Sequence, residues 1–105
     1  MFEKDLKLAL LYDRYAPLLS EKKRNIFEAY FSEDLSLAEI AQETGTSRQA
    51  VQEMIRRISG ELRRMEEALG MVARKETVTA LCRSIEQIHP DSQTKALLDQ
   101  ILENS

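Results

Sequence analysis

The chain has 105 residues, of which 43% are hydrophobic and 31% are charged, a balance typical of a folded soluble protein. It carries 18 Asp and Glu against 15 Lys and Arg, so strong non-specific binding to DNA is not expected. No apolar run approaches the roughly 18 residues of a membrane span, no signal peptide is apparent, and a single cysteine favours a reducing compartment. These features predict a cytoplasmic protein without membrane insertion.

Only 3 glycines and 2 prolines interrupt the chain, which predicts an all-α fold. Apolar residues at helical spacing, beginning with Phe2, predict a first helix from Glu3 to about Ala16. Ser20 is the expected N-cap of a second helix, whose buried stripe would be Ile26, Phe27, Tyr30 and Phe31. The basic cluster at residues 22–24 would be either solvated or used by a partner.

The next segment has the features of a helix-turn-helix. Ser36 and Glu39 are spaced as a capping box, and that helix would run to about Thr44. Gly45 supplies the left-handed turn and Ser47 the next N-cap. Small or apolar groups stand where the two helices should touch, at Ile40, Ala41, Val51 and Met54. This arrangement is the one that places a helix in the DNA major groove, although similar units also bind proteins.

The fourth helix is expected to continue from Ser47 until Gly70. Its apolar residues follow a heptad spacing through Val51, Ile55, Ile58, Leu62, Met65 and Leu69. The first half of this seam should pack on the preceding helices, whereas the second half extends past a compact helix-turn-helix and needs another surface. Gly60 could permit a close helix crossing or a bend.

Two further helices are predicted after Gly70. One runs from about Val72 to Ile88 and ends at His89-Pro90, and a shorter one is capped by Asp91 or Ser92 and carries Leu97, Leu98, Ile101 and Leu102. They should form an antiparallel hairpin. The chain would thus comprise a helix-turn-helix domain at residues 1–70 and a helical extension at residues 71–105. The apolar seams of the fourth helix and of the extension indicate a homodimer.

The net positive charge of the chain lies in the predicted fourth helix. Residues 47–64 hold 5 basic and 2 acidic side chains, whereas the segments on either side are each net negative. Arginine suits guanine and glutamine suits adenine, while serine and arginine can contact phosphates. The predicted nucleic-acid-binding residues are Ser47, Arg48, Gln49, Gln52, Glu53, Arg56, Arg57 and Arg63. Alternatively, these side chains only solvate the helix or contact a protein.

Catalysis is not expected. His89 is the single histidine and lies at a predicted helix end, and Cys82 has no second cysteine or nearby histidine, so it should be a packed structural thiol. The sequence contains no metal-ligand cluster, nucleophile elbow or phosphate-binding glycine loop. We therefore predict no enzyme activity, no cofactor and no metal.

Residues 12–51 resemble the YlxM family of small bacterial proteins. The resemblance rests on Tyr12, Tyr15, Leu18-Leu19, Tyr30-Phe31, Glu33-Asp34, Ser36-Leu37, Glu39-Ile40-Ala41 and Ser47-Arg48-Gln49-Ala50-Val51. It covers residues 1–70 well. The same segment is similar, less specifically, to promoter-binding region 4 of sigma factors, where an arginine and a glutamate open the recognition helix. Arg48 matches that pattern, whereas Gln49 and Ala50 depart from it.

The family resemblance implies a cytoplasmic bacterial protein, often encoded beside the signal recognition particle GTPase, that acts as an accessory or regulatory factor in that pathway and forms dimers. Three hypotheses follow. The protein is a DNA-binding regulator, an accessory factor that binds the particle's RNA or its GTPase, or a protein-interaction scaffold that binds no nucleic acid. We join the first two in one interpretation, a regulatory helix-turn-helix factor of the signal recognition particle pathway.

Overall fold

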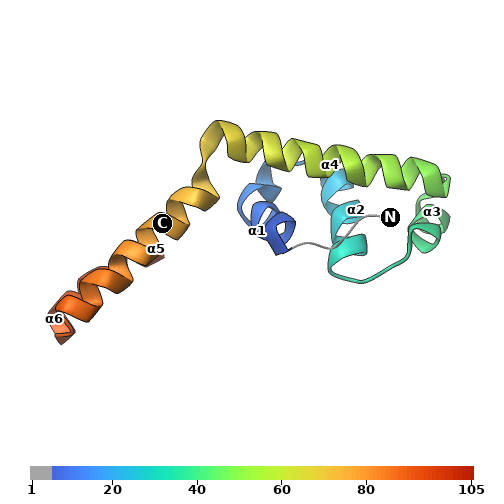
Figure 1. Ribbon diagram of the computed structural model, residues 1–105. Helices are drawn as coiled ribbons and strands as arrows, with labels where there is room; N and C mark the ends of the chain where they lie inside the picture. The colour runs from blue at the N-terminus through green and yellow to red at the C-terminus, as the bar shows by residue number, and fades with distance from the viewer. Residues whose placement is uncertain (1–5) are drawn as a thin grey trace. The chain divides into compact units, whose positions relative to one another are not determined.

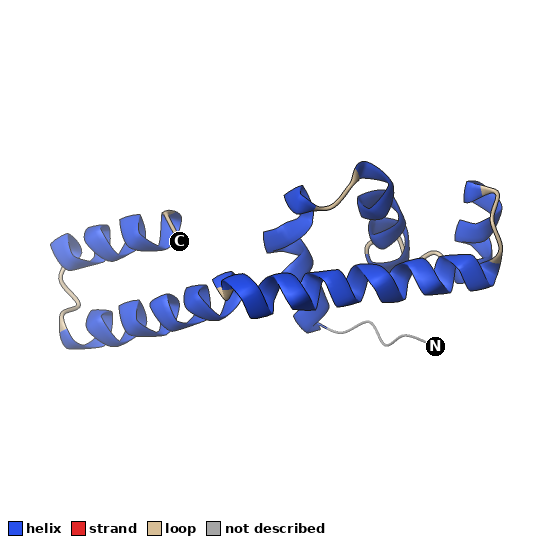
Figure 2. Ribbon diagram, turned by 90° about the horizontal axis from the view of Figure 1, so that it is seen from above, coloured by secondary structure: helices blue, strands red, loops and turns tan. Residues whose placement is uncertain are grey.

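The computed structural model describes residues 6–105, so the predicted contributions of Phe2 and Glu3 lie outside the described residues. The described chain is helical and contains no strand, which confirms the all-α prediction (Figures 1 and 2). Its contacts divide it into two compact units, and the boundary in the chain lies between Leu69 and Gly70.

The described part of the N-terminal unit, residues 6–69, contains four α-helices and one short 3-10 helix. These are α1 (Leu6–Tyr15), η1 (Ala16–Leu18), α2 (Glu21–Phe31), α3 (Leu37–Thr44) and α4 (Arg48–Leu69). The first α-helix ends one residue earlier than predicted. Pro17 disfavours the α conformation at the preceding residue, Ala16, so residues 16–18 form the 3-10 helix η1. Leu19 donates its N–H to the carbonyl of Ala16 at 3.0 Å.

The predicted helix caps are present. The Ser20 hydroxyl accepts the N–H of Lys23, and Ser36 and Glu39 exchange both bonds of the capping box at 3.1 Å. Gly45 adopts φ +70°, the left-handed conformation that its turn requires. These bonds join residues three or four apart, which is why the sequence alone predicted them.

The core of the N-terminal unit lies along one side of α4. Figure 1 shows α1, α2 and α3 on that side, and all three helices contact α4. The seam residues Val51, Ile55, Ile58 and Leu62 are at most 2% exposed. The second half of the seam was expected to need another surface, and α1 supplies part of it, since Leu62 is completely buried while Leu69 remains 47% exposed. Tyr15, itself 1% exposed, donates a hydrogen bond to Glu66 at 2.6 Å.

Aromatic rings fill the space between α1 and α2. The ring of Tyr12 stacks on that of Phe27 at 4.4 Å, and Phe27 stacks on Phe31 at 4.2 Å. Burial and, secondarily, the carboxylate of Glu28 raise the pKa of the Tyr12 hydroxyl. Phe31 is only half-buried, so the predicted stripe of α2 is correct for Ile26, Phe27 and Tyr30 and incomplete for its last member.

The C-terminal unit is a hairpin of two helices, α5 (Met71–Ile88) and α6 (Ser92–Glu103), which lie side by side in Figure 2. Asp91 caps α6 by accepting the N–H of Thr94 at 2.9 Å. In residues 70–105 only Val72, Cys82 and Leu98 are buried, and Cys82 is a packed thiol as predicted. The apolar residues that remain exposed include Leu81, Ile85, Ile88, Leu97 and Ile101.

Candidate nucleic-acid interface

The turn between α3 and α4 is held by local hydrogen bonds. The N–H groups of Gly45 and Thr46 both reach the carbonyl of Ala41, and the Thr44 hydroxyl contacts the Thr46 hydroxyl at 3.0 Å. Ile40 and Ala41 are 1% and 6% exposed, so α3 packs closely on the unit. The beginning of α4 is therefore presented on a well-supported turn, as a helix-turn-helix requires.

The first turn of α4 presents polar side chains to solvent. Ser47 caps the helix by accepting the N–H of Ala50 at 3.0 Å, which leaves its own O–H to donate to a ligand. Arg48 and Gln49 are exposed, and Gln52 is half-buried. The backbone N–H groups of this first turn have no partners within the helix, so this end of α4 also favours anions.

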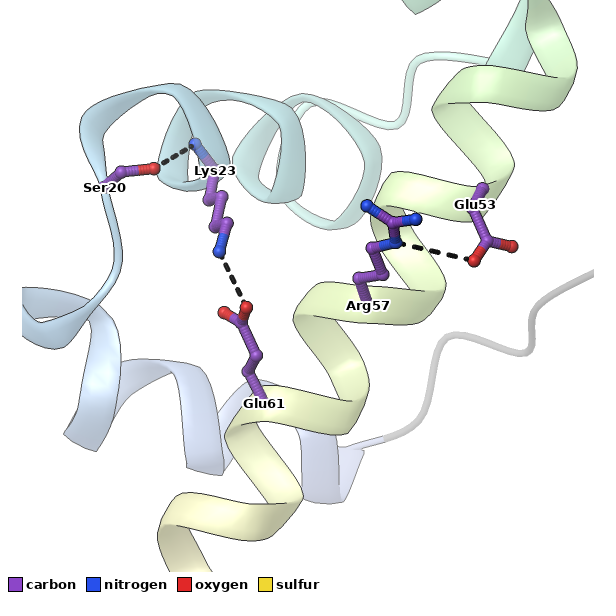
Figure 3. A network of polar contacts seen from close by, with 5 residues as sticks. All are labelled: Ser20, Lys23, Glu53, Arg57 and Glu61. Atoms are coloured by element: carbon purple, nitrogen blue, oxygen red, sulfur yellow. Dashed lines mark hydrogen bonds and ion pairs between the residues drawn. The ribbon is translucent and has the colours of Figure 1, made fainter.

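The predicted binding residues lie along a face of α4 that is largely opposite the buried seam. At 3.6 residues per turn, Gln49, Glu53, Arg56 and Arg57 point away from the core. Glu53 forms an ion pair with Arg56 at 3.5 Å. It forms a second one with Arg57 at 3.6 Å (Figure 3). All three side chains are at least half exposed, so these pairs are weak and a phosphate can replace the carboxylate.

Arg63, the last predicted residue, lies about 10 Å beyond Arg56 along the axis at 1.5 Å per residue. It does not join the compact group at the start of α4. Its exposed neighbour Arg64 was missed by the sequence prediction. The signal was available, because the segment Arg56 to Arg64 reads RRISGELRR, with two arginine pairs placed symmetrically about Gly60.

The basic cluster at the start of α2 is largely used within the unit. The Lys23 ammonium contacts the Glu61 carboxylate of α4 at 2.7 Å (Figure 3). An Arg24 guanidinium nitrogen donates to the Leu19 carbonyl at 2.6 Å. Lys23 and Arg24 are thus not simply solvated, and whether the cluster also serves a partner stays a prediction. The Lys23 contact also holds the Glu61 carboxylate toward α2.

Neither a metal site nor a membrane span is found in residues 6–105. No group of three or more His, Cys, Asp or Glu side chains in this range is placed to hold a metal ion. None of the helices described is at once long enough and apolar enough to cross a membrane. The exposed polar face of α4 is accordingly the candidate site.

Comparison with known proteins places this fold in a family. The sequence model of UPF0122, described as "Putative helix-turn-helix protein, YlxM / p13 like", matches residues 2–102. The chain belongs to the UPF0122 family. This match confirms the resemblance found in the sequence. The matched region also includes most of the α5–α6 hairpin.

Individual UPF0122 proteins are similar over different lengths. One from Symbiobacterium thermophilum is 52% identical over 67 residues, which cover 64% of this chain and 63% of that protein. One from Clostridium kluyveri is 43% identical over 76 residues, covering 72% and 68%. One from Shouchella clausii is 37% identical over 105 residues, covering 96% of each.

Proposed function

We propose that this protein is a cytoplasmic helix-turn-helix regulator that binds duplex DNA with the beginning of α4. The observation that carries the proposal is the position of Arg48, Gln49 and Gln52 on the first turns of a helix whose opposite side is locked in the core. An α-helix fits the B-DNA major groove, about 12 Å wide, whereas the major groove of A-form RNA is too deep and narrow. The geometry thus favours DNA for base recognition.

We propose in addition that this regulation serves the signal recognition particle pathway, as the resemblance to the YlxM family implies. A second candidate function is an accessory factor that binds the particle's RNA or its GTPase. The observation in its favour is Glu53, whose carboxylate stands among the predicted base-reading residues and pairs with Arg56 and Arg57. A carboxylate on the recognition face opposes the close approach of the phosphates of DNA and RNA alike, so within this second candidate it favours the GTPase.

Fluorescence anisotropy with labelled mixed-sequence duplex DNA and labelled signal recognition particle RNA, at low and near-physiological salt, tests the proposal. We expect binding to DNA that weakens steeply with salt, because counterions are released from the phosphates. The variant Arg48→Ala with Gln52→Ala should lose specific binding and keep its helicity. Arg74→Ala with Gln87→Ala on α5 is the matched control and should bind normally.

Each other outcome excludes part of the proposal. Preference for the RNA would favour the accessory factor, and unchanged affinity in the Arg48 and Gln52 variant would overturn the reading face. Flat traces with both probes would leave a protein-interaction scaffold, and binding to the GTPase would then be measured. Glu53→Gln should bind DNA about threefold to tenfold more tightly at low salt, because it removes a carboxylate and releases two arginines.

We also propose that the protein is a homodimer joined through the exposed apolar face of α5 and α6. The hairpin has 36 residues, and below about 40 residues a unit generally needs oligomerisation or another cross-link. Its face is formed by Leu81, Ile85, Ile88, Leu97 and Ile101, each at least 43% exposed. Residues 70–105 carry 4 basic and 5 acidic groups, so two copies do not repel strongly.

Static light scattering at micromolar concentration tests the dimer. We expect the mass of a dimer for the wild type and of a monomer for Leu81→Gln with Ile85→Gln, which makes the face polar. A matched control places the same change at Leu6 and Leu10 of α1, which are also exposed, and should remain dimeric. A monomeric wild type would overturn this part of the proposal.

A further inference from the structure

We infer that Gly60 and the two arginine pairs around it form a second DNA contact, a surface that takes the sugar-phosphate backbone of the duplex whose bases face the start of α4. This inference rests on the proposed function and adds a part of the site that the helix-turn-helix pattern does not specify. We call Arg56, Arg57, Gly60, Arg63 and Arg64 the arginine band.

The first observation is a glycine without a packing reason. Gly60 lies near the middle of the 22-residue helix α4, where glycine is about 1 kcal/mol less favourable than alanine. A Cβ at this position would meet only the side chain of Arg64, with its Nη1 at 3.2 Å. No other helix of the described residues therefore crosses closely at Gly60. Its backbone is covered by a single flexible arginine side chain, which can swing aside or bind a ligand as another molecule approaches.

The second observation is the charge around this glycine. The four arginines stand three or four residues before and after Gly60, exposed on the side of α4 away from the seam. Residues 56–64 hold 4 basic groups and 1 acidic group, and that acid, Glu61, is paired with Lys23. Such a surface fits a polyanion. Guanidinium groups bind phosphate oxygens through two parallel hydrogen bonds, and the Arg64 guanidinium beside the Gly60 backbone can hold a phosphate close to the helix, where a longer side chain would stand in the way.

The third observation is the distance of the band from the base-reading end. Gly60 lies twelve residues after Arg48, about 18 Å along the helix axis. Because the major groove is about 8.5 Å deep, a helix whose first turns enter the groove end-on has passed its rim by Gly60. Phosphates line that rim. The arginine band is thus placed to cross the DNA backbone while Arg48, Gln49 and Gln52 face the bases. One unbroken helix then serves both the base contacts and the backbone contacts.

Two variants test the band, with a labelled mixed-sequence duplex DNA titrated over a range of salt. Arg63→Ala with Arg64→Ala should lower the slope of log affinity against log salt by about 2, because each phosphate contact contributes about 0.9. Arg74→Ala with Arg83→Ala on α5 removes the same charge and should change the slope by less than about 0.5.

Gly60→Gln separates binding from folding. It should weaken DNA binding about tenfold while raising the thermal unfolding temperature, because glutamine is the better helix former. Ala68→Gln, which adds the same side chain at an exposed position outside the band, should keep full affinity. Higher stability with lower affinity is the result that a purely structural glycine would not produce.

The other results are also decisive. If the wild type binds DNA and both variants keep its affinity and salt slope, the band is not a contact, although the proposed function stands. If the wild type binds no duplex at any salt, the proposed function fails first and the band with it. If Gly60→Gln abolishes the dimer in light scattering and leaves DNA affinity unchanged, the glycine serves a helix crossing between copies and the inference is overturned.

Discussion

The two units of the chain use the same kind of amphipathic helix with different results. In α4, the seam residues Ile55, Ile58 and Leu62 are completely buried. In α5, Leu81, Ile85 and Ile88 have a similar spacing and are 59%, 43% and 72% exposed. Three helices cover α4, whereas within residues 70–105 only α6 is available to cover α5. Periodicity therefore shows which face is apolar, and the number of neighbouring helices decides whether that face is buried.

The difference bears on function. A binding surface requires side chains held by a rigid support, and the closed core beneath α4 provides one. The hairpin instead presents apolar area, which suits association better than recognition of a charged ligand. We therefore assign the nucleic-acid contacts to the N-terminal unit and self-association to the hairpin.

Core truncation should show this contrast most strongly. Ile58→Ala removes a completely buried side chain and should lower the free energy of unfolding by about 4 kcal/mol, from lost burial and the remaining cavity. Leu98→Ala in the hairpin should cost about 2 kcal/mol, because its surroundings can collapse. Urea unfolding followed by circular dichroism measures both. An equal or larger loss for Leu98→Ala would show that the hairpin core is as complete as that of the N-terminal unit.

The contact between α1 and the end of α4 should have the next largest effect. Tyr15→Phe removes a buried hydroxyl that donates to the Glu66 carboxylate at 2.6 Å, and should lower stability by about 2 kcal/mol. Tyr12→Phe is the matched control and should cost about 0.5 kcal/mol, because its hydroxyl is nearer to solvent. Similar midpoints of thermal unfolding for the two variants would contradict the view that Tyr15 secures α1 against α4.

The ion pair between α2 and α4 should contribute less. A double-mutant cycle with Lys23→Met and Glu61→Gln should give a coupling energy of about 0.5–1 kcal/mol, reduced by salt, since both side chains are about one-third exposed. The same cycle with Arg57→Met and Glu53→Gln should give about 0.3 kcal/mol or less, because that pair is longer and more exposed. A larger coupling in the second cycle would reverse the assignment of Glu61 to the fold and of Glu53 to the binding face.

The smallest expected effect is a pH dependence in the hairpin. Hydrogen bonds from the backbone and side chain of Thr94 lower the pKa of Asp91 below its usual 3.8. The ionised Asp91 carboxylate therefore stabilises the fold at pH values above its unfolded-state pKa. This stabilisation is lost as the pH falls through the folded-state pKa. The protection of α6 amides from exchange, relative to the intrinsic exchange rate at each pH, should therefore fall in acid, and Asp91→Asn should flatten this dependence. An acid response unchanged in Asp91→Asn would assign the effect elsewhere.

Much of the fold was predictable because its signals are local. The caps at Ser20, Ser36 and Ser47 and the turn at Gly45 depend on bonds between residues three or four apart, and the apolar periodicities on spacing within one helix. The exposed residues at the start of α4 follow from the same periodicity. The sequence by itself therefore determined the helices, the helix-turn-helix and the direction in which Arg48 and Gln49 point.

Tertiary structure decided what depends on residues far apart in the chain. The bonds from Tyr15 to Glu66 and from Lys23 to Glu61 span 51 and 38 residues, and no spacing rule links their partners. Only the first of these contacts shows that α1 packs beside the later part of α4, and only the second shows that Glu61 is held toward α2 beside the arginine band. Burial follows the same rule, because Leu62 is completely buried while Leu69 of the same seam is 47% exposed, and only the packed neighbours decide the difference.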